Sequence, residues 1–442
     1  MEINARDKPG RYKGLKTDQF LSQVINPDVN ILFVHQSFPG QYRHIINALA
    51  AQKKHTLVAV GINAPTEIIP KGVHYIRYQL EKGTSQEIHP LVAETETKVI
   101  RADACAKTAF KLKEKGFVPD IICAHPGWGE ALFIQDIWPE SPILSYQEFY
   151  YVARGVDYDF DPEFQSDLTW EKCAKVRMKN AHSQLNLESS RWNVTPTEFQ
   201  RSTFPVNWQS KISAIHDGIN TTIAAPSKSP MQLILPDKTL VQSGDPIVTF
   251  INRSLEPYRG CHSFIRSIPT IHNLNPEARI VIVGSTKGVS YGKPCNKGEF
   301  KDQFLKEIKG NYNPKNVHFT EKLPYDQLIT LFKISVAHVY LTYPFVLSWS
   351  LLEAMSSECA VIGSKTAPVE EVIQDSVNGL LVDFFQPKAI GEAVCTLLRD
   401  RKLAKQLGKN ARQSILQNYS LEVCLPQQLN LINLVAKGAL GR

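Results

Sequence analysis

The segment that decides the fold is Ile247-Val-Thr-Phe-Ile-Asn-Arg-Ser-Leu-Glu-Pro-Tyr-Arg-Gly260, an apolar run that enters a loop ending in glycine. The first half of the chain follows the same plan in Ile31-Leu-Phe-Val-His-Gln-Ser-Phe-Pro-Gly40. A strand, a loop and an amphipathic stretch together form the repeating unit of parallel sheets. The two halves share this architecture without repeating a sequence. We therefore expect an α/β protein with two doubly wound, Rossmann-like domains.

Apolar runs of strand length recur along both halves. The first half predicts strands at residues 31–35, 57–60, 121–124 and 143–145, with helices at 42–52 and 97–115. The second half predicts strands at residues 247–251, 280–283, 317–319, 338–341, 360–363 and 379–382. Near the end of the first half, Thr195, Pro196 and Glu198 fit a capping box with proline at the first helical position.

Turn residues and prolines divide the chain into parts. Four prolines fall between Ala225 and Pro246, which predicts a linker there. The predicted parts are an N-terminal extension (1–28), an N-terminal Rossmann-like domain (29–225), a linker (226–246), a C-terminal Rossmann-like domain (247–418) and a C-terminal helical segment (419–442) that packs back toward the first domain. Ligands of doubly wound sheets bind at the carboxyl ends of the strands, so we expect the site in an interdomain cleft.

Composition limits the function classes. The formal net charge is +7, from 50 Lys+Arg against 43 Asp+Glu, too mild an excess to predict a nucleic-acid partner. Eight cysteines without a C-x-x-C pair favour reduced thiols over a zinc site or a disulfide framework. No apolar run approaches the roughly 20 residues that span a bilayer. We expect a cytoplasmic protein, and the basic balance leaves peripheral binding to the inner membrane face open.

Two arginines and a glutamate are candidates for binding a nucleotide. Arg253 and Arg259 follow an apolar strand on the loop that enters a helix, where cations and helix N–H groups suit a diphosphate. The alternative is that both are surface arginines. Glu353 is the lone charge in the apolar stretch 347–355, and a buried carboxylate needs a donor partner. A ribose diol is one such partner; a place at the edge of the core is the other interpretation.

Further candidates follow strands of the first half. His125 ends a strand before a Gly/Pro turn, where it either binds a sugar hydroxyl or phosphate, or caps the turn. Gly40 permits close approach of backbone to a ligand. Trp128, Glu148 and Tyr150 lie in aromatic stretches that either line an acceptor cleft or pack in the core.

An acidic stretch offers a competing interpretation. Asp157-Tyr-Asp159-Phe-Asp161 holds two overlapping D-x-D patterns, which ligate Mg²⁺ or Mn²⁺ in some transferases. No strand runs into this stretch, so we expect an acidic loop near the acceptor and no metal site. The motifs of P-loop NTPases, zinc proteases, α/β-hydrolases and dinucleotide-binding sites are absent from the sequence.

Four motifs together resemble the retaining glycosyltransferases of family 4, which have the GT-B fold. They are Phe33-Val-His-Gln-Ser-Phe-Pro-Gly-Gln-Tyr-Arg-His44, Ala124-His-Pro-Gly-Trp-Gly-Glu-Ala131, Pro257-Tyr-Arg-Gly260 and Leu341-Thr-Tyr-Pro-Phe-Val-Leu-Ser-Trp-Ser-Leu-Leu-Glu-Ala-Met355. The resemblance covers residues 31 to 417 and is closest to a bacterial subgroup.

The resemblance implies roles for residues at matching positions. Gly40 would lie under the donor phosphates, Arg253 and Arg259 would hold the diphosphate, and His125 would lie near the transferred sugar. The remaining donor-side positions are Tyr343, the amides near Leu347 and Ser348 for the distal phosphate, and Glu353 for the ribose. One position departs from the family pattern, because Phe345 replaces the first glutamate of the E-x7-E motif.

The implied reaction is transfer of a hexose from a nucleotide sugar, with UDP as the expected nucleotide. The acceptor class stays open between a glycan, a lipid-linked molecule, a peptide and a small molecule. The implied mechanism is front-face attack with retention, needing no metal and no cofactor. Two alternatives remain: a GT-B sugar-nucleotide epimerase, and a non-catalytic subunit that binds a nucleotide sugar.

Overall fold

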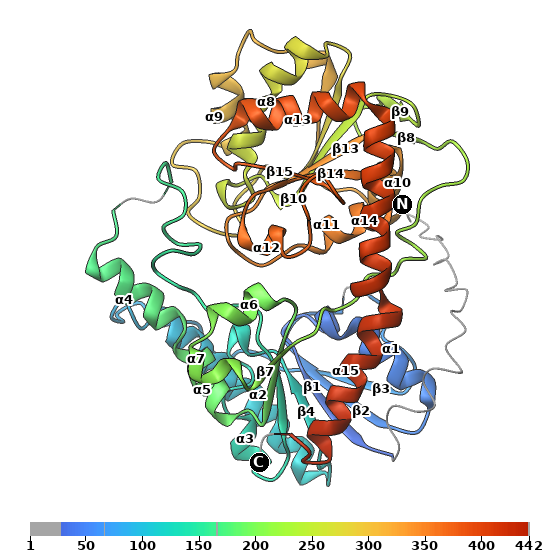
Figure 1. Cartoon of the computed structure of the whole chain (residues 1–442). Coiled ribbons are helices and arrows are strands. Elements are labelled where there is room, and N and C mark those ends of the chain that lie inside the picture. The colour runs from blue at the N-terminus through green and yellow to red at the C-terminus, as the bar shows by residue number, and fades with distance from the viewer. Residues whose placement is uncertain (1–27, 66, 165–166, 441–442) are drawn as a thin grey trace, which may run out of the picture.

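The computed structural model describes residues 28–65, 67–164 and 167–440 and shows two α/β domains, one above the other in Figure 1. The predicted extension at residues 1–28 lies outside the described residues, except for Asp28. Within the described ranges, no helix combines the length and the apolar character needed to cross a membrane.

The first domain is built on a seven-stranded parallel sheet with the order β3-β2-β1-β4-β5-β6-β7. Its strands are β1 (Asn30–Val34), β2 (Thr56–Gly61), β3 (Val73–Arg77), β4 (Ile121–Ala124), β5 (Ile143–Tyr146), β6 (Trp192–Thr195) and β7 (Ile212–Ala214). Its longer helices are α1 (Arg43–Gln52), α2 (Ala93–Glu114), α4 (Trp170–Lys179) and α5 (Ala181–Ser189). The four predicted strands are confirmed, and β3, β6 and β7 are additional.

The second domain holds a six-stranded parallel sheet with the order β12-β11-β10-β13-β14-β15. Its strands are β10 (Ile247–Ser254), β11 (Arg279–Ser285), β12 (Val317–Thr320), β13 (Ala337–Tyr340), β14 (Ala360–Ser364) and β15 (Leu380–Val382). Its helices include α8 (Cys261–Leu274), α9 (Phe300–Glu307), α10 (Tyr325–Ile334), α11 (Trp349–Ser356), α12 (Ala367–Glu370), α13 (Pro387–Arg399) and α14 (Arg401–Asn418). All six predicted strands are confirmed, and with them the two-domain α/β fold class.

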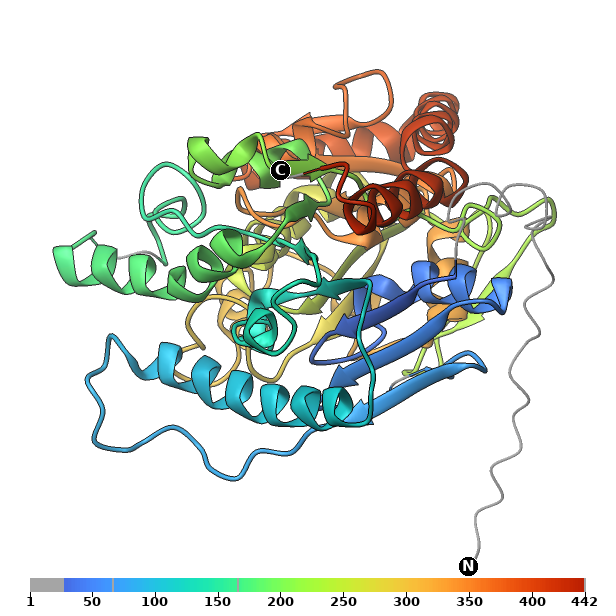
Figure 2. The ribbon, with the colours of Figure 1, turned by 90° about the horizontal axis from the view of Figure 1, so that it is seen from below.

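Both sheets are covered on two faces, as parallel sheets require. In β1, Leu32 and Val34 pack with Cys105 of α2, whereas Ile31 and Phe33 pack with residues of α15 (Leu421–Ala436). Figure 2 shows α2 and α15 on opposite sides of the first sheet. The last helix of the chain therefore completes the core of the first domain.

The stretch predicted as a linker has structure of its own. Residues 232–242 form an antiparallel hairpin, β8 (Gln232–Ile234) with β9 (Leu240–Gln242). Leu233, Leu235 and Val241 are buried with core residues of the second domain. These strands are short and lie among prolines, so their alternation of inward-facing and outward-facing residues could not be recognised in the sequence.

The predicted capping box is wrong by two residues. Thr195 is the last residue of β6, and helix α6 (Glu198–Thr203) begins after Thr197. The Thr197 hydroxyl accepts a hydrogen bond from the Gln200 amide at 3.1 Å. Thr197 is therefore the N-cap, and its hydroxyl also donates to Gln200 Oε1 at 3.0 Å.

The chain crosses between the domains twice, and the two crossings touch. Ile219 leaves the first domain and Ser420 returns to it, and the two form a parallel bridge. The Ile219 amide donates to the Tyr419 carbonyl at 2.8 Å, and the Leu421 amide donates to the Ile219 carbonyl at 3.0 Å. We call residues 219 and 419–421 the hinge.

Candidate functional site

The loops that follow β1, β4 and β5 of the first sheet face those that follow β10 and β13 of the second. Most of the predicted site residues lie on these loops, and they converge from positions far apart in sequence. Each is described below by its contacts.

Gly40 sits in a tight turn against a histidine that the sequence analysis had not singled out. Its φ of +49° favours glycine, and a Cβ there would lie 2.3 Å from the His35 ring. His35 Nδ1 accepts a bond from the Ser37 amide at 3.0 Å, and its Nε2 lies 2.7 Å from Gln41 Oε1. Burial lowers the pKa of His35 to about 4, so the ring is neutral and donates to Gln41. Because a side chain at position 40 would overlap the His35 ring, Gly40 allows this ring to lie beside the cleft.

His125 caps the turn that follows β4, which is one of the two interpretations of its sequence position. Its Nδ1 accepts a hydrogen bond from the Gly127 amide at 3.1 Å and so caps the turn. Burial, with the nearby His35, lowers the pKa of His125 well below its ordinary value, so the neutral ring carries its proton on Nε2. This buried Nε2 has no hydrogen-bond partner among the described residues. His125 is therefore a fixed, neutral donor.

Aromatic rings hold His125 in place. It stacks on Trp128 with ring centroids 4.4 Å apart and on Tyr146 at 5.3 Å. Tyr150 is not part of this group, because it packs on Phe204 at 5.5 Å in a small separate cluster. Trp128 thus lies at the predicted site, and Tyr150 faces the neighbouring helices.

Arg253 and Arg259 are held very differently. Arg253 is exposed at the end of β10 and makes no hydrogen bond or ion pair within the described part of the chain. Arg259 is 8% exposed, and its Nη1 donates to Thr342 Oγ1 at 2.9 Å and to the Val346 carbonyl at 2.9 Å. One arginine is therefore free to bind an anion, and the other is fixed beside it.

Glu148 faces these arginines from the first domain. Burial raises the pKa of its carboxyl, while the charges of Arg253 and Arg259 act in the opposite direction. Its Oε1 also accepts a weak hydrogen bond from Gln41 Nε2 at 3.5 Å. The interaction places Glu148 close to the predicted diphosphate position.

Phe345 fills a cage of rings from both domains. Its ring lies 4.7 Å from Phe149 of the first domain and 4.7 Å from Tyr291 of the second, and it is 2% exposed. The Arg259 guanidinium lies 5.6 Å from the same ring. An unpaired carboxylate at this position would be strongly disfavoured, so the surroundings match the phenylalanine.

The start of α11 has its amide and side-chain groups already engaged. Ser348 is the N-cap, and its own amide donates to the Tyr340 hydroxyl at 2.8 Å. Leu347 is buried in the core of the second domain. The Tyr343 hydroxyl donates to Asp161 at 2.7 Å and is fully buried. In this conformation the Ser348 amide and the Tyr343 hydroxyl are engaged, whereas the Leu347 amide makes no hydrogen bond within the described residues.

Glu353 has the donor partner that its buried position requires. It is 9% exposed, and the Tyr325 hydroxyl donates to its Oε1 at 2.7 Å. Burial raises the pKa of the Glu353 carboxyl, and the Tyr325 bond and the charge of Arg43 oppose this rise. Glu353 lines a cavity of about 30 Å³ with Arg43, Asn220 and Trp349, so residues from both sides of the domain boundary surround it.

The acidic loop contacts the second domain through its aspartates. Asp157 and Asp161 are fully buried. The Tyr258 hydroxyl donates to Asp157 at 3.0 Å, and His262 Nε2 lies 3.1 Å from Asp161. Burial raises the pKa of Asp157 to about 6, while the bond from Tyr258 acts against the rise. Across residues 28–65, 67–164 and 167–440, no three metal-ligating side chains gather into a potential metal site.

Asp217 also joins the two domains, and the sequence analysis assigned it no role in the site. It accepts a hydrogen bond from the Tyr146 hydroxyl at 3.0 Å and from Trp349 Nε1 at 2.9 Å. Burial raises the pKa of Asp217 to about 7, although both hydrogen bonds lower it. Its position directly after β7, at the approach to the hinge, was the available signal.

Family models match both halves of the chain. The model of the glycosyl transferase family 4 group matches residues 53–224, and that of glycosyl transferases group 1 matches residues 232–414. The two matches meet where the first sheet gives way to the hairpin. The chain belongs to the family 4 glycosyltransferases and has the GT-B fold, so it is a transferase enzyme.

Curated relatives match over part of their length. An uncharacterized glycosyltransferase of Methanocaldococcus jannaschii is 28% identical over 172 residues, which are 39% of this chain and 41% of that protein. D-inositol 3-phosphate glycosyltransferase of Corynebacterium glutamicum is 24% identical over 211 residues, 46% of each chain. The matched region thus spans less than half the length of these relatives.

Solved structures share the whole architecture at low identity. Sucrose-phosphate synthase of Thermosynechococcus elongatus has a TM-score of 0.69 and 16% identity, covering 93% of this chain and 100% of that one. Anabaena HepE in complex with UDP and glucose has a TM-score of 0.62 and 14% identity over the same shares. Structural similarity at this low sequence identity establishes the fold alone.

Proposed function

We propose that the protein transfers a sugar from a nucleoside diphosphate sugar to an acceptor, with retention of anomeric configuration. The observation that carries the proposal is that the charges of Arg253 and Arg259 both act on the Glu148 carboxyl, so the two guanidinium groups lie near one point between the domains. One is an exposed cation without a partner in the described chain, and the other is fixed by Thr342 and Val346. Two adjacent guanidinium groups suit a diphosphate leaving group.

The remaining residues take roles consistent with that position. The neutral Nε2–H of His125 would donate to the transferred sugar, and Glu353 would accept the ribose hydroxyls in place of Tyr325. Gly40 would lie under the donor phosphates, with Ser348 and its amide freed from Tyr340 for the distal phosphate. The two arginines would stabilise the departing charge, so no metal and no cofactor is required.

UDP is the nucleotide we propose. HepE, which shares the fold over the whole length, has been solved with UDP and with UDP-glucose. The acceptor would enter beside Trp128, on the first domain. The stacked pair of Trp128 and His125 provides a flat surface at that point.

Calorimetry with UDP, GDP, ADP and dTDP tests the donor assignment. We expect one diphosphate, UDP, to bind with a dissociation constant in the micromolar range. Glu353→Ala should weaken it about tenfold or more, because a carboxylate that accepts hydrogen bonds is lost. The matched control is Glu422→Ala, an exposed glutamate on α15. If no diphosphate binds, the chain has the fold without the donor site.

A second function, binding without transfer, is favoured by one observation. Phe345 is buried among rings at a position where the family motif has a glutamate, so one polar contact to a sugar is missing. A partner subunit would bind UDP-glucose but release no UDP with any acceptor. A UDP-release assay with a mixture of acceptors separates the two functions, because only a transferase releases UDP. NMR of the product then shows whether the anomeric configuration is retained or inverted.

A further inference from the structure

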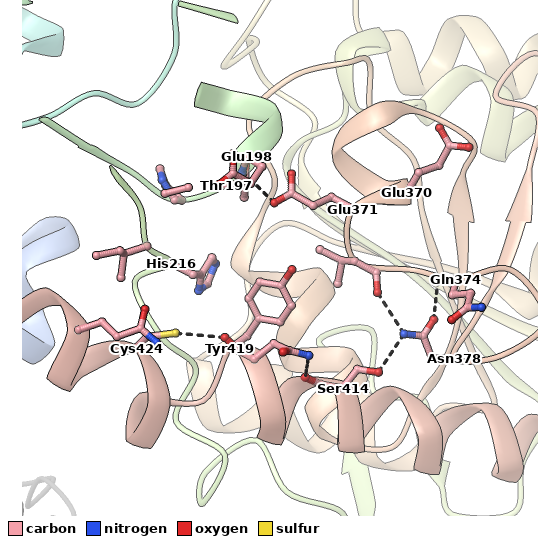
Figure 3. A pocket seen from close by; sticks show the side chains of 16 residues that line it. Thr197, Glu198, His216, Glu370, Glu371, Gln374, Asn378, Ser414, Tyr419 and Cys424 are labelled. Atoms are coloured by element: carbon pink, nitrogen blue, oxygen red, sulfur yellow. Dashed lines mark hydrogen bonds between the residues drawn. The ribbon is translucent and has the colours of Figure 1, made fainter. Parts of the chain in front are cut away.

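A cavity of about 500 Å³ lies beside the hinge, apart from the cleft residues assigned above (Figure 3). Its walls come from both domains. The first domain contributes residues that follow β6 and β7 together with the start of α15, and the second contributes α12, the loop after it and α14. None of Arg253, Arg259, His125 and Glu353 lines it.

The domain boundary at this cavity is held by one carboxylate. The Glu371 side chain accepts hydrogen bonds from the Glu198 amide at 2.8 Å and the Phe199 amide at 2.7 Å, which are the free N–H groups at the start of α6. Figure 1 shows α6 and α12 facing each other across the boundary. The cavity therefore lies between this contact and the hinge.

A buried histidine supplies a free donor to the cavity. His216 is 5% exposed, and its Nδ1 accepts a hydrogen bond from the Gly218 amide at 3.0 Å. Burial lowers the pKa of His216 to about 4, so the neutral ring carries its proton on Nε2. Within the described residues this Nε2–H has no partner, and His216 lines the cavity.

A tyrosine stands next to it. The Tyr419 ring meets the His216 ring edge to face at 5.4 Å (Figure 3). Burial raises the pKa of Tyr419 to about 12, and the charge of Glu371 adds to the rise, so the hydroxyl keeps its proton. The hydroxyl makes no hydrogen bond to any part of the chain that the structure describes. Two rings and two free donors thus share one wall.

Acceptors occupy the facing wall. Glu370, Glu371 and Gln374 line it, Glu198 adds a carboxylate from the first domain, and among the described lining residues there is no lysine or arginine. The carboxylates disfavour an anionic ligand, such as a nucleotide or a sugar phosphate. A bare cation would leave the donors of His216 and Tyr419 without an acceptor. Hydroxyl groups, which both donate and accept, satisfy both walls.

We propose that the hinge cavity is a binding site for an uncharged saccharide of one or two sugar units. Its volume lies within the roughly 300–1,000 Å³ of small-molecule sites. Aromatic rings beside mixed donors and acceptors match the alternating C–H and O–H groups of a sugar. The site is separate from the donor site and does not depend on the donor assignment.

Saturation-transfer NMR on the full chain tests the proposal, with glucose, N-acetylglucosamine and maltose as uncharged probes. Glucosamine and glucose 6-phosphate serve as the cationic and anionic probes. We expect transfer to at least one uncharged probe and none to glucose 6-phosphate. UDP is present at a saturating concentration throughout. It occupies the donor cleft, so the probes cannot bind there through their phosphate or hydroxyl groups.

Two substitutions locate the binding. Tyr419→Phe keeps the ring and removes the hydroxyl, and Gln374→Leu changes an exposed side chain of the wall. Together they should weaken saccharide binding about tenfold and leave UDP affinity unchanged. Gln413→Leu, on an exposed position of α14 outside the cavity, is the matched control.

Three outcomes overturn the proposal. They are no transfer to any uncharged probe, binding of glucosamine alone, and saccharide binding that the double variant leaves at full strength. The last would assign the signal to the acceptor side of the cleft. Failure of UDP to bind wild-type protein would remove the proposed donor site but not this one.

Discussion

Replacing each arginine of the cleft separates anion binding from stability. Arg253 has no partner in the described chain, so Arg253→Ala should change the free energy of unfolding by no more than about 0.5 kcal/mol. Its proposed charge-assisted bonds to the diphosphate contribute about 1.5–3 kcal/mol. UDP should therefore bind roughly ten- to 150-fold more weakly. The transfer rate should fall about 10²–10³-fold.

Arg259→Ala should affect both quantities. It leaves Thr342 Oγ1 and the Val346 carbonyl without their donor, and each lost buried partner costs about 1–3 kcal/mol. The rings of Phe345 and Tyr291 also lose the guanidinium that lies 5.6 Å and 5.4 Å away. We expect a destabilisation of about 2–5 kcal/mol together with weaker UDP binding.

Urea unfolding and calorimetry on both variants measure the difference. Lys405→Ala, an exposed position on α14, controls for loss of a positive charge. Unchanged UDP affinity in Arg253→Ala would refute the diphosphate assignment. A stability loss in Arg253→Ala as large as that in Arg259→Ala would refute the description of Arg253 as unpartnered.

Two further predictions concern His125 and Asp217. His125→Phe keeps a ring between Trp128 and Tyr146 but removes the Nε2 donor. The transfer rate should therefore fall about a hundredfold, while the affinity for UDP stays within about twofold of wild type. A transfer rate equal to that of wild type would exclude the proposed role of His125. Folding raises the pKa of the Asp217 carboxyl from 3.8 to about 7, so the folded protein holds this proton more tightly than the unfolded chain does. The stability that the protonated carboxyl contributes is therefore full below pH 4 and is lost as the pH rises through 7. Urea unfolding from pH 4 to pH 8 should show a shallower fall for Asp217→Asn than for wild type, and parallel curves would contradict the assignment.

Strands with continuous apolar sequence could be predicted, and those without it could not. β10 and β13 are buried on both faces, so their sequences are nearly uniform in character. β3 is an edge strand whose residues His74, Tyr75 and Arg77 are half-buried or exposed, and its sequence resembles a loop. The hairpin β8–β9 was hidden because its strands are three residues long and lie among prolines.

The strands and loops that carry the candidate site residues could be predicted, but the partners of those residues could not. The rule that ligands bind beyond the carboxyl ends of strands brings His125, Arg253 and Arg259 together. The Tyr343 hydroxyl bonds to Asp161 across 182 residues, and Tyr258 to Asp157 across 101. Periodicity carries no information on such pairs, so the sequence did not show that the acidic stretch forms an interdomain contact.

These pairs also bear on how a donor enters. The acidic loop holds the domains together through Asp157–Tyr258, Asp161–Tyr343 and the exposed Glu163–Arg266 pair. A hydrogen bond contributes a net 0.5–1.5 kcal/mol and an exposed ion pair about 0–1, so the three sum to roughly 1–4 kcal/mol.

These three contacts alone correspond to an open form at roughly 0.1–10% of the population, and the contacts of Asp217, Glu371 and Phe345 across the same boundary lower that population further. Micromolar binding of UDP releases about 8 kcal/mol, which exceeds the contribution of the three loop contacts. The closed cleft is therefore compatible with donor exchange, provided that UDP favours the closed form once inside. Small-angle scattering should give a radius of gyration that is unchanged or slightly smaller on adding UDP. A clear increase would mean that UDP stabilises the open form, and the acidic loop would then oppose donor binding.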